Sequence, residues 1–140
     1  MKNQTFNPIA EETIINTLNE LKFSSQGLIP AIAQQYDTGE ILMMAWMNMD
    51  AVRETLQTGI ICYWSRSRKA LWRKGETSGQ TQALKNFRYD CDRDTILVLV
   101  DQKGVACHTG RRSCFFHETT ADGIKSISEA VIDPAKLYPQ

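Results

Sequence analysis

A short segment near the middle of the chain, YDCDRD at residues 89–94, combines three aspartates with one cysteine. Carboxylate oxygens suit Mg²⁺, Mn²⁺ or Ca²⁺, whereas a thiolate suits softer metals such as zinc. In an extended strand alternate side chains face opposite ways, so the carboxylates of Asp90, Asp92 and Asp94 share one face. Cys91 then points to the other face, where it can serve a different metal. Because close carboxylates repel one another unless a cation or water relieves the charge, the spacing predicts an oxygen-ligated cation site, with an acidic turn between strands as the alternative.

The same three aspartates also match the first three ligand positions of an EF-hand calcium loop. Two features contradict that interpretation. The sixth loop position is Thr95, where an EF-hand requires glycine. The residues that follow, ILVLV at 96–100, have the composition of a buried strand. We therefore do not expect an EF-hand loop here.

A second cluster, ACHTGRRSC at residues 106–114, contains two cysteines and a histidine. Cys107 and Cys114 can reach one zinc ion across a loop, and Cys91 can join them from a neighbouring strand. Three thiolates would leave an open fourth position for water, as in catalytic zinc sites. His108 is either a fourth ligand or a proton shuttle that titrates near neutral pH. The alternative is a pair of buried, reduced cysteines, and for Cys62 in its apolar segment we expect only packing.

A third stretch, SRSRKALWRKGETSGQ at residues 65–80, is strongly basic. Its cations are Arg66, Arg68, Lys69, Arg73 and Lys74. Arginine binds phosphate through paired hydrogen bonds, while Gly75 and Gly79 allow a ligand to approach the backbone closely. The stretch has no Walker or dinucleotide-binding glycine pattern, so any phosphate site is built from side chains. A solvated basic hairpin is the alternative.

Composition limits the class of protein that can carry these clusters. The 140 residues favour one domain spanning 1–140, with 42% hydrophobic and 23% charged residues. Sixteen basic and sixteen acidic residues cancel, which argues against nucleic acid as a partner. No apolar run reaches the roughly 18 residues of a membrane span, and the N-terminus lacks a signal-peptide pattern. We expect a cytoplasmic protein, whose four cysteines are not structural disulfides.

The predicted elements alternate short helices with strands. Periodicity predicts a helix over 9–23, a hairpin of strands 29–36 and 41–47 around 37–40, and a helix over 49–57. The apolar run 41–47 also fits a helix. Further strands are expected at 60–66, 70–75, 81–91, 95–101 and 113–118, and a weak helix at 124–132. Strands outnumber helices and most connections are short, so the predicted fold class is α+β, with a mostly antiparallel sheet and a few short helices.

Together the three clusters resemble one family. The segments SRSRKALWRKGETSGQ, YDCDRD and ACHTGRRSCFF, in this order and spacing, are similar to those of phosphoribosyl-AMP cyclohydrolase of histidine biosynthesis. The resemblance covers a motif-bearing core of about residues 28–116. The C-terminal tail, 117–140, is too short for the pyrophosphohydrolase domain that some members carry, so the resemblance implies a monofunctional form.

This resemblance implies a hydrolysis. Water adds at C6 of the adenine ring of phosphoribosyl-AMP, and the N1–C6 bond opens to give phosphoribosyl-formimino aminoimidazole carboxamide ribotide. The ribosyl group on N1 makes C6 electrophilic, and a zinc-bound water with a pKa of about 7 is a suitable nucleophile.

The resemblance also assigns roles to individual residues. It implies zinc ligands at Cys91, Cys107 and Cys114, magnesium ligands at Asp90, Asp92 and Asp94, and a general base or proton shuttle at His108. Substrate contacts are expected from Arg66, Arg68, Trp72, Lys74, Gly75, Glu76, Ser78 and Gly79. The family further implies an intertwined homodimer in which Cys91 of one chain meets the other two cysteines of its partner. The aspartates beside Cys91 are then expected to face the substrate pocket of their own chain.

A different class of function remains open from the residues alone. A non-catalytic structural-zinc module could bind nucleotides or RNA through the basic stretch and Trp72. That alternative leaves the three aspartates unexplained, and structural zinc is usually held by four protein ligands. Neutral net charge weakens it further. The cyclohydrolase hypothesis accounts for all three clusters with one site.

Overall fold

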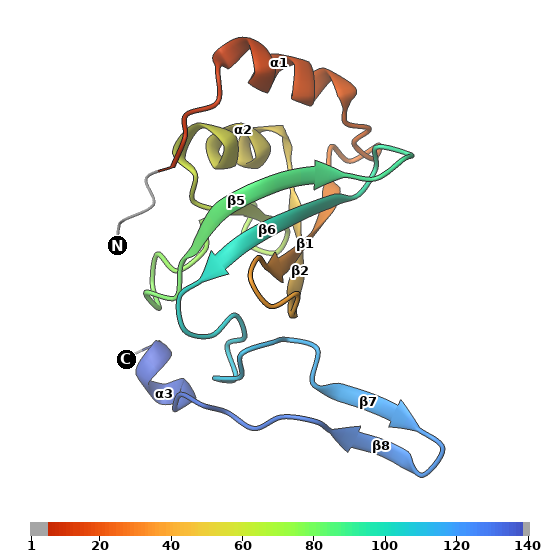
Figure 1. The fold of residues 1–140 in the computed structure, drawn as a ribbon, viewed down its shortest axis with the longest axis vertical. Helices are drawn as coiled ribbons and strands as arrows, with labels where there is room; N and C mark the ends of the chain where they lie inside the picture. The colour runs from red at the N-terminus through yellow and green to blue at the C-terminus, as the bar shows by residue number, and fades with distance from the viewer. Residues whose placement is uncertain (1–5, 139–140) are drawn as a thin grey trace.

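A computed structural model describes residues 6–138 of the chain (Figure 1). The elements are α1 (Glu11–Glu20), β1 (Ile29–Gln35), β2 (Ile41–Met47), α2 (Met49–Thr58), β3 (Cys62–Ser65), β4 (Ala70–Arg73), β5 (Gln82–Tyr89), β6 (Ile96–Gln102), β7 (His117–Thr120), β8 (Gly123–Ser126) and α3 (Pro134–Leu137). Within these residues no helix combines the length and the apolar character needed to cross a membrane.

The strands form one four-stranded sheet and two separate hairpins. The sheet has the order β2-β1-β6-β5, and the hairpins are β3-β4 and β7-β8. All pairs are antiparallel except β1 with β6, which is parallel. The α+β class with mostly antiparallel pairing is therefore confirmed. The parallel pair joins the antiparallel pairs β1-β2 and β5-β6 at the centre of the sheet, where both edges of the apolar strand β6 are paired.

Helix α2 begins and ends where local signals predict, whereas α1 is shorter than the predicted 9–23 and has no side-chain cap. The Asn48 side chain accepts a hydrogen bond from the backbone N–H of Ala51 at 2.9 Å and so caps the start of α2. Gly59 ends α2 in the left-handed conformation, with φ of 78°. Helix α1 buries Ile14 and Leu18 and packs against α2.

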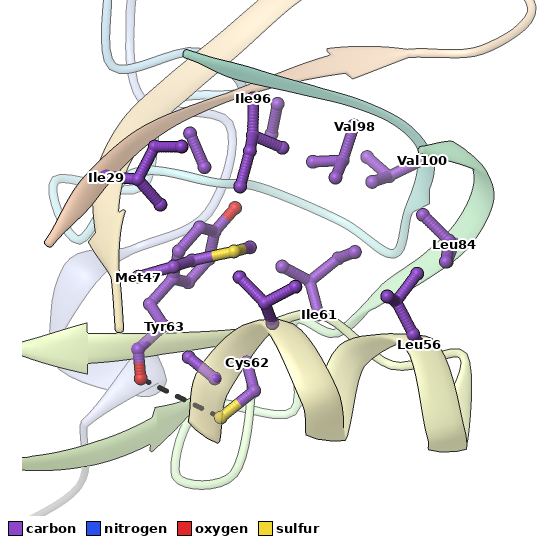
Figure 2. Close-up of a cluster of buried hydrophobic side chains, with 14 of the residues drawn as sticks. Ile29, Met47, Leu56, Ile61, Cys62, Tyr63, Leu84, Ile96, Val98 and Val100 are labelled. Carbon is purple, nitrogen blue, oxygen red and sulfur yellow. Dashed lines mark hydrogen bonds between the residues drawn. The ribbon is translucent and has the colours of Figure 1, made fainter. Parts of the chain in front are cut away.

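The core lies between the sheet and α2. Ile96, Val98 and Val100 alternate along β6 toward this core, and Leu56 of α2 lies in the same cluster (Figure 2). Fully burying such a side chain stabilises the fold by about 1.5–3 kcal/mol. Cys62 is also fully buried in this cluster, and burial raises the pKa of its thiol to about 12. The prediction that Cys62 packs in the core is confirmed.

The C-terminal region differs from the prediction. The expected strand at 113–118 begins only at His117, and the expected helix at 124–132 is replaced by strand β8 and irregular chain. Residues 120–123, TADG, form a tight turn in which Thr120 Oγ1 donates to the carbonyl of Gly123 at 2.9 Å. An Asp-Gly pair favours such a hairpin turn, whereas a short helix needs a packing surface. Ile124 is 79% exposed, so this segment has no such surface within the described chain.

Candidate active site

The chemically active clusters lie at opposite ends of one strand (Figure 1). The aspartate turn, residues 90–94, precedes β6, and the thiol loop, residues 106–114, follows it. Strand β6 has seven residues, Ile96–Gln102. At 3.3 Å per residue it separates the two clusters by roughly 23 Å.

The aspartate turn is a chain reversal and not the end of an extended strand. The pairing of β5 with β6 stops at Tyr89 and Ile96, so the chain must turn back between them. The Arg93 N–H donates to the Asp90 carbonyl at 3.0 Å, and the Asp94 N–H donates to Asp90 Oδ1 at 3.1 Å. The prediction that strand alternation arranges these side chains is therefore wrong.

The turn nevertheless brings the three carboxylates together. One oxygen from each of Asp90, Asp92 and Asp94 lies within 4.8 Å of the others, and all three residues are exposed. Among the described residues this is the one group of three or more such side chains with that spacing. Three hard oxygen donors at this separation fit a divalent cation such as Mg²⁺. Their assignment as magnesium ligands stays a prediction.

The thiol loop is held in shape by backbone hydrogen bonds. Ala106 N–H donates to the Arg112 carbonyl at 3.0 Å, and Gly110 N–H donates to the Cys107 carbonyl at 3.0 Å. The end of the loop is fixed to β2, because the Cys114 N–H donates to the Leu42 carbonyl at 2.7 Å. These bonds bring the two cysteines of the loop beside each other.

The two thiols of the loop lie beside each other, one buried and one exposed. Cys107 is buried, and Thr109 Oγ1 donates to its sulfur at 3.0 Å. Cys114 is exposed. Partial loss of surrounding water and the adjacent Cys107 thiol nevertheless raise the pKa of Cys114 to about 12. The Lys74 ammonium acts in the opposite direction on this pKa. Two adjacent thiols fit zinc, which binds cysteine as the thiolate, so zinc binding would displace the proton of Cys114.

Lys74 is buried beside these thiols and is not part of a solvated hairpin. Only 3% of Lys74 is exposed, and its Nζ donates to the Ala106 carbonyl at 2.9 Å. The ammonium also lies 5.6 Å from the centre of the Trp72 ring. Burial lowers the pKa of Lys74, while the nearby thiols Cys114 and Cys107 favour its charged form. The neighbouring Arg73 points away and pairs with Glu54 at 2.6 Å.

The thiols open onto a cavity of about 480 Å³, here called the thiol cavity. Its wall includes Cys107, His108, Cys114, Trp72, Lys74 and Tyr138. His108 is exposed at this wall. His117 lines the cavity as well, with its ring 4.3 Å from that of Phe116. The cavity therefore offers a proton-transfer group beside a pair of soft metal ligands.

A second cavity of about 370 Å³, the basic-loop cavity, lies against the third sequence cluster. The predicted substrate residues that line it are Arg68, Trp72, Lys74, Gly75, Glu76 and Ser78. Gly75 has φ of +88°, and a Cβ there would lie 2.6 Å from the Thr81 nitrogen, so the loop requires glycine. Two predicted residues are not in the wall of this cavity. The Arg66 guanidinium carbon lies 5.1 Å from the centre of the Trp46 ring, and Gly79 does not line the cavity.

Cys91 is not near the other two cysteines of its own chain. It is exposed in the aspartate turn, at the far end of β6 from the thiol loop. The expectation that the aspartates face the pocket of their own chain is wrong for the same reason. Any ion that binds Cys91 together with Cys107 must therefore be held by two chains.

Comparison with known proteins agrees with the motif pattern. A family model described as phosphoribosyl-AMP cyclohydrolase matches residues 43–116. A phosphoribosyl-AMP cyclohydrolase of Magnetococcus marinus is 63% identical over 121 residues, covering 86% of this chain and 94% of the relative. That of Gluconobacter oxydans is 56% identical over 134 residues, covering 96% and 85%. The chain belongs to the phosphoribosyl-AMP cyclohydrolase family.

The cyclohydrolase family model spans both ends of β6 but stops before β7. All residues predicted as metal ligands, and His108, lie inside the matched span. Sequence reasoning missed Thr109, although it stands two residues after Cys107 within the recognised motif. It also missed Tyr138, which lines both cavities and lies outside the family match. No local pattern marks Tyr138, because only the folded tail brings it to the site.

Proposed function

We propose that this chain is a cyclohydrolase that opens the N1–C6 bond of the adenine ring of phosphoribosyl-AMP, a step of histidine biosynthesis. The supporting observation is that the thiol cavity and the basic-loop cavity have Trp72 and Lys74 in common. A purine at the thiols and a phosphoribosyl group at the basic loop would thus belong to one bound molecule. The product is phosphoribosyl-formimino aminoimidazole carboxamide ribotide, formed when water oxygen bonds to C6.

The thiol cavity is the proposed zinc centre. Cys107 and Cys114 would hold zinc together with Cys91 of the partner subunit. When bound, zinc supplies a water of lowered pKa, which suits attack on an electrophilic ring carbon. The buried ammonium of Lys74 adds positive charge that offsets the charge of the thiolates.

His108 is the proposed proton-transfer residue. It lines the cavity on the loop between the two cysteines. A neutral imidazole there would accept the proton released as water adds at C6. A proton must also reach N1 when the N1–C6 bond breaks, and the same imidazolium can deliver it. His108 thus accounts for one of the two protons of the water; the other would pass from the C6 hydroxyl to the exocyclic imino nitrogen, which becomes the amide nitrogen of the product.

We further infer a homodimer whose active sites are each built from both chains. The length of β6, which separates Cys91 from the thiol loop of its own chain, supports this arrangement. If Cys91 reaches the thiol loop of the partner subunit, its neighbouring aspartates reach the same site. The proposed Mg²⁺ of the aspartate turn would then act in the same composite site as the zinc. The four-stranded sheet offers an apolar row as a surface for the partner. Met44 of β2 is 44% exposed and lies opposite Ile32 of β1, which in turn lies opposite Leu97 of β6.

The first test is an absorbance assay of ring opening on phosphoribosyl-AMP, with and without a chelator. We expect turnover that the chelator abolishes and added zinc restores. Turnover that is unchanged after removal of all bound metal would refute the zinc proposal. An inactive metal-loaded protein would refute the proposed activity.

The second test mixes two inactive variants, Cys91→Ser and Cys107→Ser, after unfolding and refolding them together. Each mixed dimer contains one site with both substitutions and one site with none. Random pairing in a two-fold symmetric dimer should therefore restore about a quarter of the wild-type activity. The matched control mixes Cys107→Ser with Cys114→Ser, which damage the same half of the site and should restore nothing. Restoration in the control, or none in the first mixture, would contradict the shared site.

A further inference from the structure

The C-terminal segment, residues 128–138, is tied to the thiol loop. The N–H of Val131 donates to the Gly110 carbonyl at 2.9 Å, and Arg111 Nε donates to the Ser128 carbonyl at 3.0 Å. Gly110 has φ of +86°, and a Cβ on it would collide with the Ile132 carbonyl oxygen. The close approach of the segment therefore depends on a glycine inside the thiol loop.

The end of this segment is also fixed. Asp133 caps α3 by accepting a hydrogen bond from the Ala135 N–H at 3.0 Å. Leu137 is only 3% exposed, so it anchors the last described turn in the protein interior. The position of Tyr138 follows from these contacts. It is the next residue, and it lies at the mouth of both cavities.

Tyr138 joins the two cavities of the site. Just three residues line both of them, and these are Trp72, Lys74 and Tyr138. Trp72 is half-buried and packs against Tyr63, with ring centres 5.4 Å apart, while Lys74 is bonded to Ala106. Tyr138 is 43% exposed and brings an aromatic ring to this junction. Aromatic rings bind nucleosides by stacking and apolar contact, with little dependence on hydrogen bonds.

We propose that Tyr138 is a substrate-binding residue whose ring packs against the nucleoside where it passes from the basic-loop cavity to the thiol cavity. This inference rests on the proposed function for the identity of the substrate. It assigns the tail, which the family model does not cover, a part in nucleotide binding. The ring, and not the hydroxyl, carries the effect.

The test compares Tyr138→Ala and Tyr138→Phe with the wild type and with Tyr36→Ala. Tyr36 is a matched control, because it is also 43% exposed and lines neither cavity. We expect Tyr138→Ala to raise KM for phosphoribosyl-AMP about tenfold, as for loss of one stacking contact, with kcat within about threefold. Tyr138→Phe and Tyr36→Ala should stay near wild type. Zinc content and the urea midpoint should be the same in all four proteins.

Three results would overturn the inference. They are an unchanged KM in Tyr138→Ala, an equal defect in Tyr138→Phe, and a loss of zinc or kcat that accompanies the KM change. Calorimetric binding of AMP separates this inference from the proposed function. If the wild type does not turn over phosphoribosyl-AMP, the proposed function fails. Weaker AMP binding by Tyr138→Ala than by wild type would still support the role of the ring, and equal binding would refute it.

Discussion

The aspartate turn and the thiol loop contrast in how complete each is within one chain. The aspartate turn is exposed, and its three carboxylates lie within 4.8 Å of one another. In the thiol loop Cys107 is buried and Cys114 is exposed; the loop is hydrogen-bonded to β2 and lies beside a buried lysine, yet it brings together only two thiols. Hard oxygen donors need little burial to bind a cation, whereas a catalytic zinc centre needs a dry, shaped cavity. Under the proposed metal assignments, a single chain thus contains all three oxygen ligands of the magnesium site and two of the three thiols of the zinc site.

Cys91 connects the two regions in sequence but not in space. It lies inside the aspartate turn, so the third thiol of the proposed zinc site belongs to the same turn as the proposed magnesium ligands. The comparison therefore suggests that the two ends of β6 meet only when two chains meet. The predictions below break one region at a time.

The largest effect is expected from Cys107→Ala. Loss of a central ligand should remove most of the zinc, and with it about 4 kcal/mol of transition-state stabilisation, on the order of a 1,000-fold loss of kcat/KM. Metal analysis and the ring-opening assay measure the two effects. Cys62→Ala is the control, since its buried thiol lies in the core and should leave zinc in place. Full zinc content in Cys107→Ala would remove the thiol loop from the metal centre.

Asp92→Asn is expected to act on the other region alone. Neutralising one of three carboxylates should weaken Mg²⁺ binding and lower activity on the order of 100-fold at limiting Mg²⁺, while zinc content stays at the wild-type level. A magnesium titration of the activity measures this. Asp122→Asn, in the exposed β7-β8 turn, is the matched control. Identical magnesium curves for Asp92→Asn and wild type would reduce the aspartate turn to an acidic loop.

His108→Ala should reduce kcat by about 100-fold or more without loss of either metal, because a proton-transfer group contributes about 10²–10⁴-fold. His117→Ala is the control, as the other histidine of the cavity wall. Loss of zinc from His108→Ala would instead make this residue a ligand.

The smallest effect concerns stability. Arg112 of the thiol loop donates to the Gly104 carbonyl at 2.7 Å and to Glu40 at 3.0 Å, with its side chain 33% exposed. Arg112→Ala should lower the free energy of unfolding by about 1–3 kcal/mol. The ion pair beside the aspartate turn, Arg93 with Glu20, is more exposed, so Glu20→Gln should cost less than about 1 kcal/mol. Urea unfolding of the two variants measures both changes in the free energy of unfolding. Equal losses of stability would remove the contrast between an anchored thiol loop and an open aspartate turn.

The parts of the structure that follow from local signals were predictable. Asn48 and Gly59 fix the ends of α2 through short-range capping, and the hairpin of β1 and β2 lies within its predicted ranges. The gathering of the three aspartates was expected from their spacing, although a turn and not a strand produces it. Close residues can meet by more than one local geometry, so the contact was easier to predict than its cause.

The parts that depend on distant contacts were not predictable. Lys74 is buried by its bond to Ala106, which lies 32 positions away, so a basic stretch gives no sign that one of its cations is enclosed. Tyr138 reaches the cavities only because Leu137 is buried and the segment is bonded to Gly110. The failed prediction of a helix at 124–132 has the same origin, since a weak apolar periodicity without a packing surface does not fix a helix.

The length of β6 has a consequence for how activity would depend on the amount of protein. Strand β6 holds Cys91 apart from Cys107. If the active site is shared between two chains as proposed, an isolated chain is inactive, however well it is folded. Activity would then follow mass action. Well below the dissociation constant of the dimer, it would fall with the square of the total chain concentration, so that dilution alone switches the enzyme off.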